Sequence, residues 1–182
     1  LPNMPAGSNS GAILSNDSKT LAFVNSNGDT PGDIYSYDLA SAVSKRLIKS
    51  LSADIDANDL IPGEVVRFDS SDGFSIPGVL LKPRQAVAGA KLPALIWVHG
   101  GPGGESRIRY DGRLQFFANQ GYVIYSINTR GSSGSGKTYF HLDDHAHGTA
   151  DLRDIVESKQ MLKDLGYVDP DKIAIMGGSY GG

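Results

Sequence analysis

Short apolar segments alternate with segments of helical periodicity from residue 61 onward, and this alternation restricts the fold more than any other feature of the chain. Residues 94–98 are apolar throughout, which is typical of a strand covered on both faces. The further expected elements are a helix near residues 110–120, a strand at 122–127, a helix ending before Gly166 and a strand at 173–176. Strands that alternate with helices form a parallel sheet joined by crossovers. Residues 61–182 therefore predict an α/β fold.

Two local patterns add detail to this prediction. Residues 64–68 and 76–81 flank the turn Ser71-Asp72-Gly73, which predicts a β-hairpin ahead of the apolar strands. The helix before Gly166 has apolar residues at helical spacing, and we expect them to share one buried face. They are Leu152, Ile155, Val156, Leu162 and Leu165.

The first 60 residues have a different pattern, with short alternating runs separated by turn residues. The expected strands are 11–14, 20–24, 34–39 and 45–48. Four short strands within about 40 residues are typical of one blade of a β-propeller. An isolated antiparallel meander is the alternative interpretation, because one blade alone does not establish a propeller.

Composition excludes several classes of function. The chain has 17 Lys and Arg against 20 Asp and Glu, a formal net charge of −3, so we expect no nucleic-acid partner. It has no cysteine, which excludes a disulfide framework, a thiolate metal site and a cysteine nucleophile. The longest apolar run, 94–98, is far shorter than the roughly 18 residues of a membrane span, so no membrane partner is expected. No signal-peptide pattern is present at the start, which slightly favours the cytoplasm over the periplasm or secretion.

The last predicted strand, which we expect to be buried, leads directly into a glycine-rich turn around Ser179. Residues 177–181 form the pattern G-x-S-x-G, which at the end of an apolar strand is typical of a nucleophile elbow. Glycines suit this turn because side chains would collide across it and because its positive φ disfavours a Cβ atom. Ser179 is therefore the candidate nucleophile, with Gly177, Gly178 and Gly181 forming the elbow. A glycine-rich surface turn is the alternative.

A second glycine-rich segment, His99-Gly100-Gly101-Pro102-Gly103-Gly104, follows the apolar strand 94–98. In α/β-hydrolases the loop at this place and the residue after the nucleophile each direct one backbone N–H at the reacting oxygen. We therefore assign the two oxyanion donors to the amides of Gly101 and Tyr180, with His99, Gly100 and Pro102 completing the oxyanion loop. A plain Gly-Pro turn is the alternative.

Residues 131–138 match the phosphate-binding pattern G-x-x-x-x-G-K-[ST] and follow a strand, so a P-loop nucleotide-binding protein is a further alternative. In that case Lys137 would contact phosphate and Thr138 would contact magnesium. Such a site needs a long helix directly after the lysine. Residues 139–148 are a short stretch with two adjacent acids and a final glycine, which disfavours this alternative.

Together these segments resemble the prolyl oligopeptidase family of serine peptidases, closest to its acylaminoacyl-peptidase-like and dipeptidyl-peptidase-like members. The matching pieces are 68–83 with Asp72-Gly73, His99 to Pro102, 128–132 with Gly134 and Gly136, and 169–182. The resemblance explains the P-loop pattern as a loop of the family. His147 stands before Gly148, where the family often has a tryptophan, and we expect His147 to have a packing or surface role. The resemblance implies a propeller-blade-like segment at 1–60 and the N-terminal part of an α/β-hydrolase catalytic domain at 61–182.

The resemblance also implies a reaction. Ser179 would attack the carbonyl of a peptide or acyl-peptide bond in a short peptide substrate and form an acyl-enzyme. A carboxylesterase or lipase of the same fold shares the elbow and the oxyanion loop and remains an alternative, as does a non-catalytic scaffold protein. No cofactor is expected.

The residues that must activate Ser179 are missing from their expected place. In α/β-hydrolases an Asp or Glu and then a His follow the serine, but only Tyr180, Gly181 and Gly182 do so here. All four histidines precede it: His99 belongs to the oxyanion loop, and the others form an exposed loop in which no third ligand suggests a metal site. They are His141, His145 and His147. We therefore expect the N-terminal part of a larger hydrolase, or one of two associating pieces, that is inactive alone. Its last strand would have an unpaired edge, which also permits a homo-oligomer.

Overall fold

The computed structural model describes residues 1–182 and divides them into two compact units. The first contains Leu1–Pro62 together with Ile108–Gln115, and the second contains Gly63–Arg107 together with Phe116–Gly182. No helix in either unit has the length and hydrophobicity that crossing a bilayer requires.

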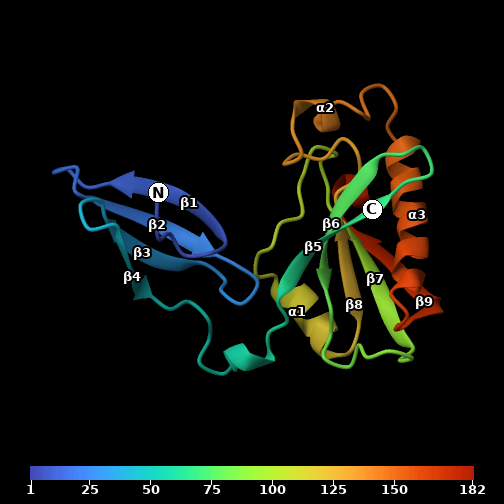
Figure 1. Cartoon of the computed structure of the whole chain (residues 1–182), viewed down its shortest axis with the longest axis horizontal. Coiled ribbons are helices and arrows are strands. Elements are labelled where there is room, and N and C mark those ends of the chain that lie inside the picture. The colour runs from blue at the N-terminus through green and yellow to red at the C-terminus, as the bar shows by residue number, and fades with distance from the viewer. The chain divides into compact units, whose positions relative to one another are not determined.

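The first unit is a four-stranded antiparallel sheet in which each strand pairs with the next one along the chain (Figure 1). Its strands are β1 (Ser8–Leu14), β2 (Thr20–Ser26), β3 (Asp33–Asp38) and β4 (Val43–Ile48), followed by the short helix η1 (Ala57–Asp59). Phe23 and Tyr37 are buried on this sheet, and the buried carboxylate of Asp33 pairs with Arg46. The four predicted strands and their all-β arrangement are confirmed.

The second unit is built on a mixed five-stranded sheet in the order β5-β6-β8-β7-β9 (Figure 1). The strands are β5 (Gly63–Asp69), β6 (Ser75–Leu81), β7 (Leu92–Val98), β8 (Val123–Ile127) and β9 (Val168–Gly177). β6 pairs antiparallel with β5 on one side and with β8 on the other, whereas β7 runs parallel to both β8 and β9. The predicted hairpin and the predicted parallel strands are therefore both present, and the α/β fold is confirmed.

The helices are α1 (Gly112–Asn119), α2 (Lys137–Phe140), α3 (Ala150–Asp164) and the single turn η2 (Ser179–Gly181). α3 lies along the sheet and ends as predicted, with Gly166 at φ +76° just beyond it. Its buried face is rotated from the predicted one. Ile155, Leu162 and Leu165 pack against the core, but Leu152 and Val156 are 52% and 62% exposed. The buried residues of the helix are Asp151, Asp154, Ser158 and Leu162.

This difference has a physical cause. Residues three and four apart share a helix face, so Asp151, Asp154, Ser158 and Leu162 form one continuous stripe. Three members of the stripe are polar, and hydrophobic periodicity does not detect them. The burial of the two carboxylates is possible because Arg130 pairs with Asp154 and Tyr180 binds one oxygen of Asp151, as described below.

The core of the second unit is contributed mainly by β6, β7 and β8. Ala94, Ile96 and Val98 are buried, which confirms that the apolar run 94–98 is a covered strand. β9 is different, because it stands at the end of the sheet with β7 as its neighbour. Ile175 and Met176 on β9 are exposed, so the expectation of a buried last strand is wrong, while the predicted unpaired edge is present.

Candidate active site

Ser179 stands at a sharp strand-to-helix turn. β9 ends at Gly177, and Ser179 begins the turn η2 with a φ of +58°. The left-handed region is costly for a residue with a Cβ atom, and such strain persists only where the surrounding structure enforces it. Ser179 is also exposed. Its hydroxyl therefore has the strained and accessible setting that a nucleophile elbow provides.

Crowding at the end of β7 explains two of the three elbow glycines. A Cβ atom on Gly177 would lie 2.9 Å from the carbonyl oxygen of Val98, and one on Gly181 would lie 2.9 Å from that of His99. Real Cβ atoms do not approach backbone so closely, so both positions require glycine. Gly178 differs, because it has open space around its Cα and an extended φ of −149°. The expectation that every glycine of the elbow is sterically required is therefore wrong for Gly178.

The oxyanion loop approaches Ser179 directly. A Cβ atom on Gly100 would lie 3.1 Å from the Cβ of Ser179 and 3.6 Å from its Oγ. Because β7 and β9 are adjacent parallel strands, the segments that follow them meet at one edge of the sheet. The structure thus brings together two motifs that are about 75 residues apart in the sequence. Gly101, with φ +139°, holds a backbone conformation that favours glycine.

The ring of His99 belongs to the loop rather than to a proton relay. Its Nδ1 lies 2.9 Å from the carbonyl oxygen of Gly100, and its Nε2 lies 2.9 Å from Oγ of Ser132. A carbonyl oxygen only accepts, so Nδ1 donates, and in the neutral ring Nε2 accepts the Ser132 hydroxyl proton. Both nitrogens are engaged in holding the loop, which excludes His99 in this arrangement as the base for Ser179.

Tyr180 is anchored through its side chain. Its hydroxyl donates a hydrogen bond of 2.6 Å to Oδ2 of Asp151, a carboxylate at the start of α3. Partial burial and this bond to an anion raise the pKa of Tyr180 to about 12. Burial alone would raise the pKa of Asp151, but the bond from Tyr180 and backbone amides outweigh it, so that pKa is lowered. Sequence reasoning missed Asp151, and its spacing from Asp154 and Ser158 was the available signal.

The comparisons with known proteins agree with this geometry. A model of the prolyl oligopeptidase family matches residues 108–182. Dipeptidyl aminopeptidase BIII of Pseudoxanthomonas mexicana is 32% identical over 172 residues, covering 91% of this chain and 25% of that protein. The chain is similar to the prolyl oligopeptidase family over residues 108–182 and to this peptidase over most of its own length. It spans about a quarter of the length of this relative.

Two further proteins show a similar degree of likeness to this chain. Dipeptidyl peptidase 8 of Mus musculus is 34% identical over 130 residues, covering 68% of this chain and 15% of that protein. Among solved structures, a puromycin-hydrolyzing peptidase of Mycobacterium tuberculosis superposes with a TM-score of 0.82 and 26% identity. That match covers 90% of this chain and 26% of the peptidase. It includes both the blade-like sheet and the mixed sheet, since it covers most of the chain.

The segment that resembles a P-loop has another role in this structure. The helix that begins at Lys137, α2, has only four residues, so it does not provide the long helix that a phosphate site requires. Ser132 contacts His99, and Ser133 donates from Oγ to the carbonyl oxygen of Gly103 at 2.7 Å. This loop therefore contacts the oxyanion loop. The nucleotide-binding alternative lacks its structural requirement.

The three remaining histidines occupy the loop before α3. The ring of His147 stands edge-on to that of Tyr180 at 5.7 Å, and its Nδ1 lies 3.0 Å from Oδ2 of the buried Asp143. Nδ1 of His141 lies 2.8 Å from Oδ2 of Asp144 at an exposed position. His145 is in the left-handed region, at φ +60°. His147 thus packs beside the elbow, in agreement with its predicted packing or surface role.

A cavity of about 450 Å³ lies beside the elbow. One part of its lining comes from the oxyanion loop and the elbow, with His99, Pro102 and Tyr180. The other part is apolar, from Leu152 and Ile175 on α3 and β9. Exposed apolar side chains, those of Leu152 and Ile175, therefore lie next to the candidate nucleophile.

Replacing Ser179 with glycine is expected to stabilise the fold relative to Ser179→Ala. The left-handed conformation costs a residue with a Cβ atom about 1–2 kcal/mol, and glycine avoids this cost. Glycine in turn lowers the free energy of unfolding by about 0.4–1 kcal/mol, because it gives the unfolded chain more conformational freedom. The glycine variant should therefore be more stable by up to about 1 kcal/mol in urea unfolding. The same pair of substitutions at exposed Ser135, which lacks a positive φ, should reverse the order. A less stable glycine variant at position 179 would contradict the strained elbow.

Proposed function

We propose that this chain carries the nucleophile and oxyanion hole of a serine-type peptidase that cleaves peptide or acyl-peptide bonds of short peptides. The observation that carries the proposal is the contact between the two motifs. Gly100 lies against a Ser179 that is held at positive φ and exposed. In this arrangement the amides of Gly101 and Tyr180 receive the substrate oxygen, and Gly177 and Gly181 allow the turn to pack on β7.

The reaction proceeds through an acyl-enzyme. Oγ of Ser179 attacks the carbonyl carbon while its proton passes to a base, and the oxygen becomes an anion stabilised by the two amides. The tetrahedral intermediate then releases the amine, which takes up that proton, and leaves the acyl group on Oγ. Water, deprotonated by the same base, then attacks the ester carbonyl carbon. The bond to Oγ breaks, Oγ takes back the proton from the base, and the acid is released.

The base and its carboxylate partner come, in this proposal, from protein beyond residues 1–182. They belong either to the same polypeptide or to an associated one. Two observations support this: both ring nitrogens of His99 are engaged, and the ring of His147, whose Nδ1 lies against Asp143, makes no hydrogen bond to Oγ of Ser179. The exposed edge of β9 and the apolar cavity beside Ser179 offer a surface for such a segment. Without it we expect the chain to be inactive.

Comparing an amide with an ester separates a peptidase from a carboxylesterase or lipase of the same fold. The relatives and the solved neighbour are named as peptidases, and the puromycin-hydrolyzing enzyme is named for its substrate. We expect the complete gene product to hydrolyse peptide p-nitroanilides with a kcat/KM of about 10⁴ M⁻¹s⁻¹ or more. Turnover of p-nitrophenyl esters with no detectable cleavage of any peptide anilide would instead favour the esterase.

A further inference from the structure

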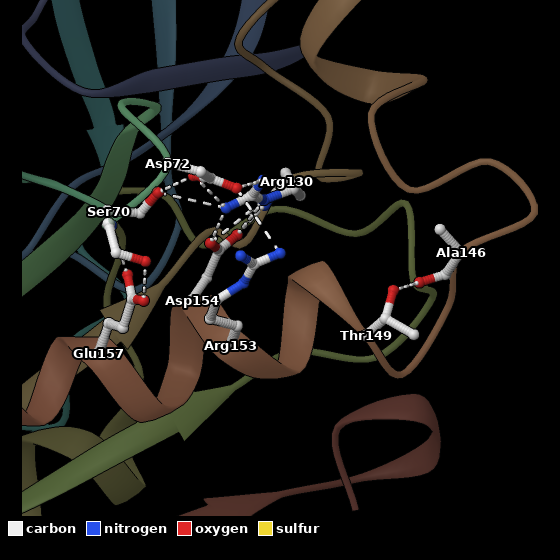
Figure 2. Close-up of polar contacts among 9 residues, drawn as sticks. Ser70, Asp72, Arg130, Ala146, Thr149, Arg153, Asp154 and Glu157 are labelled. Carbon is white, nitrogen blue, oxygen red and sulfur yellow. Dashed lines mark hydrogen bonds and ion pairs between the residues drawn. The ribbon is translucent and has the colours of Figure 1, made fainter.

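An ionic cluster surrounds the buried Arg130, the residue that precedes the loop touching the oxyanion segment (Figure 2). Arg130 follows β8 and is 3% exposed. Its guanidinium donates to Oδ1 of Asp154 on α3 at 2.6 Å and to Oδ2 of Asp72 in the β5–β6 turn at 2.7 Å. Three segments that are distant in the sequence are therefore joined through one side chain.

The cluster fixes the backbone as well as the side chain. Oδ2 of Asp154 accepts the backbone N–H of Arg130 at 2.9 Å and its Nε–H at 3.0 Å. Hydrogen bonds from Arg130 and Ser70 hold the pKa of Asp72 well below its usual range, so this carboxylate is charged at neutral pH. A planar guanidinium can serve two carboxylates at once, which a lysine ammonium cannot do with the same geometry.

The segment around Arg130 holds the oxyanion loop at both ends. Upstream, Oδ1 of Asn128 accepts the N–H of Ser106 at 2.6 Å, and its Nδ2 donates to the carbonyl of Ser106 at 2.9 Å. Downstream, Ser132 contacts Nε2 of His99 at 2.9 Å, and the N–H of Ser133 donates to the carbonyl oxygen of Gly104 at 3.0 Å. The position of Arg130 therefore determines where these hydrogen-bonding groups stand.

We propose that Arg130, clamped by Asp154 and Asp72, is a positioning residue for the oxyanion hole. It acts through Ser132 and Ser133, which hold the loop 99–104 against Ser179. The proposal rests on the proposed function, because it concerns how the donor amide of Gly101 is aimed. The positioning role of Arg130 differs from a general stabilising role. A misplaced donor amide weakens the binding of the transition state without weakening the binding of the substrate.

The test uses the complete gene product with the variants Arg130→Lys and Ser132→Ala. Arg130→Lys keeps the positive charge but loses the planar guanidinium that binds two carboxylates. Ser132→Ala removes the contact with His99 without disturbing the ion cluster. Arg153→Ala is the matched control: Arg153 lies 3.6 Å from Asp72, is 46% exposed and belongs to the same cluster, and no contact described above joins it to the loop. The measurements are kcat, KM and the affinity of a peptidyl trifluoromethyl ketone, whose adduct on serine places an oxyanion in the hole.

We expect both variants to lose about 10²-fold in kcat, as loss or displacement of one oxyanion donor does, with KM changed less than about threefold. Affinity for the ketone should fall in parallel with kcat. Hydrogen exchange of the amides in 99–106 should accelerate in both variants, while exchange in α3 stays unchanged in Ser132→Ala. Arg153→Ala should match the wild type in each measurement.

The outcomes separate the two proposals. If the wild type is active and both variants behave like Arg153→Ala, the positioning role is overturned and the proposed function stands. The positioning role is also overturned if the two variants raise KM but leave kcat and the affinity for the ketone at wild-type values. A wild type that neither cleaves peptides nor binds the ketone refutes the proposed function itself. Should Arg130→Lys fail to fold, Ser132→Ala decides the question alone.

Discussion

Replacement of Ser179 by alanine is expected to reduce hydrolysis by the complete gene product about 10⁶-fold, as loss of the nucleophile does in a serine peptidase. No other group in the structure takes its place, because the effect depends on the exposed hydroxyl at the strained turn beside Gly100. Alanine retains the Cβ atom, so the backbone strain and the packing on β7 are unchanged. The measurements are steady-state cleavage of a peptide anilide and labelling by a fluorophosphonate probe.

Ser135→Ala is the matched control for this substitution. Ser135 is exposed and lies in the loop after β8, and its hydroxyl makes none of the contacts with the oxyanion loop described for Ser132 and Ser133. It should be labelled and should turn over substrate as the wild type does. Undiminished labelling of Ser179→Ala would show that another residue is the nucleophile, and the proposed function would then be wrong.

The 182-residue chain on its own is expected to react with the fluorophosphonate at least about 10⁴-fold more slowly than the complete gene product. A serine hydroxyl is a weak nucleophile until a base removes its proton. Both ring nitrogens of His99 are engaged elsewhere, and the ring of His147 makes no hydrogen bond to Oγ of Ser179. The measurement is the labelling rate at equal protein concentration, with circular dichroism confirming that the chain is folded.

Supplying the rest of the protein as a second polypeptide provides the control. If the missing base is the cause, mixing the two pieces should restore labelling at Ser179. If misfolding is the cause, the circular dichroism spectrum should show it. Rapid labelling of the folded chain alone would contradict the proposal that its base lies beyond residue 182.

Local sequence was sufficient for most of the elements. The four strands of the first unit, the hairpin of β5 and β6 and the covered strand β7 were all predicted, because alternation and apolar runs report directly on which faces are buried. The end of α3 at Gly166 was also predicted, since glycine readily adopts the left-handed conformation found there. These features depend on neighbouring residues alone.

The glycine patterns likewise indicated the site. The turn around Ser179 and the segment from His99 to Gly104 were both recognised, because close backbone approach and positive φ restrict the residue types that fit. The same reasoning overestimated Gly178, whose surroundings are open. A pattern marks the turn, but it does not tell which of its glycines touches a neighbour.

Tertiary structure alone decided how the site is supported. The burial of Asp151 and Asp154 depends on Tyr180 and Arg130, which lie 29 and 24 residues away in the sequence, and no local period shows such pairing. The exposure of Leu152 and Ile175 likewise depends on which other segments of the fold cover α3 and β9. The sequence by itself therefore predicted the main elements and the candidate nucleophile, since both follow from local backbone and hydrophobic constraints. The partners of buried charges were determined only by the folded chain, because desolvation makes pairing obligatory without specifying the partner.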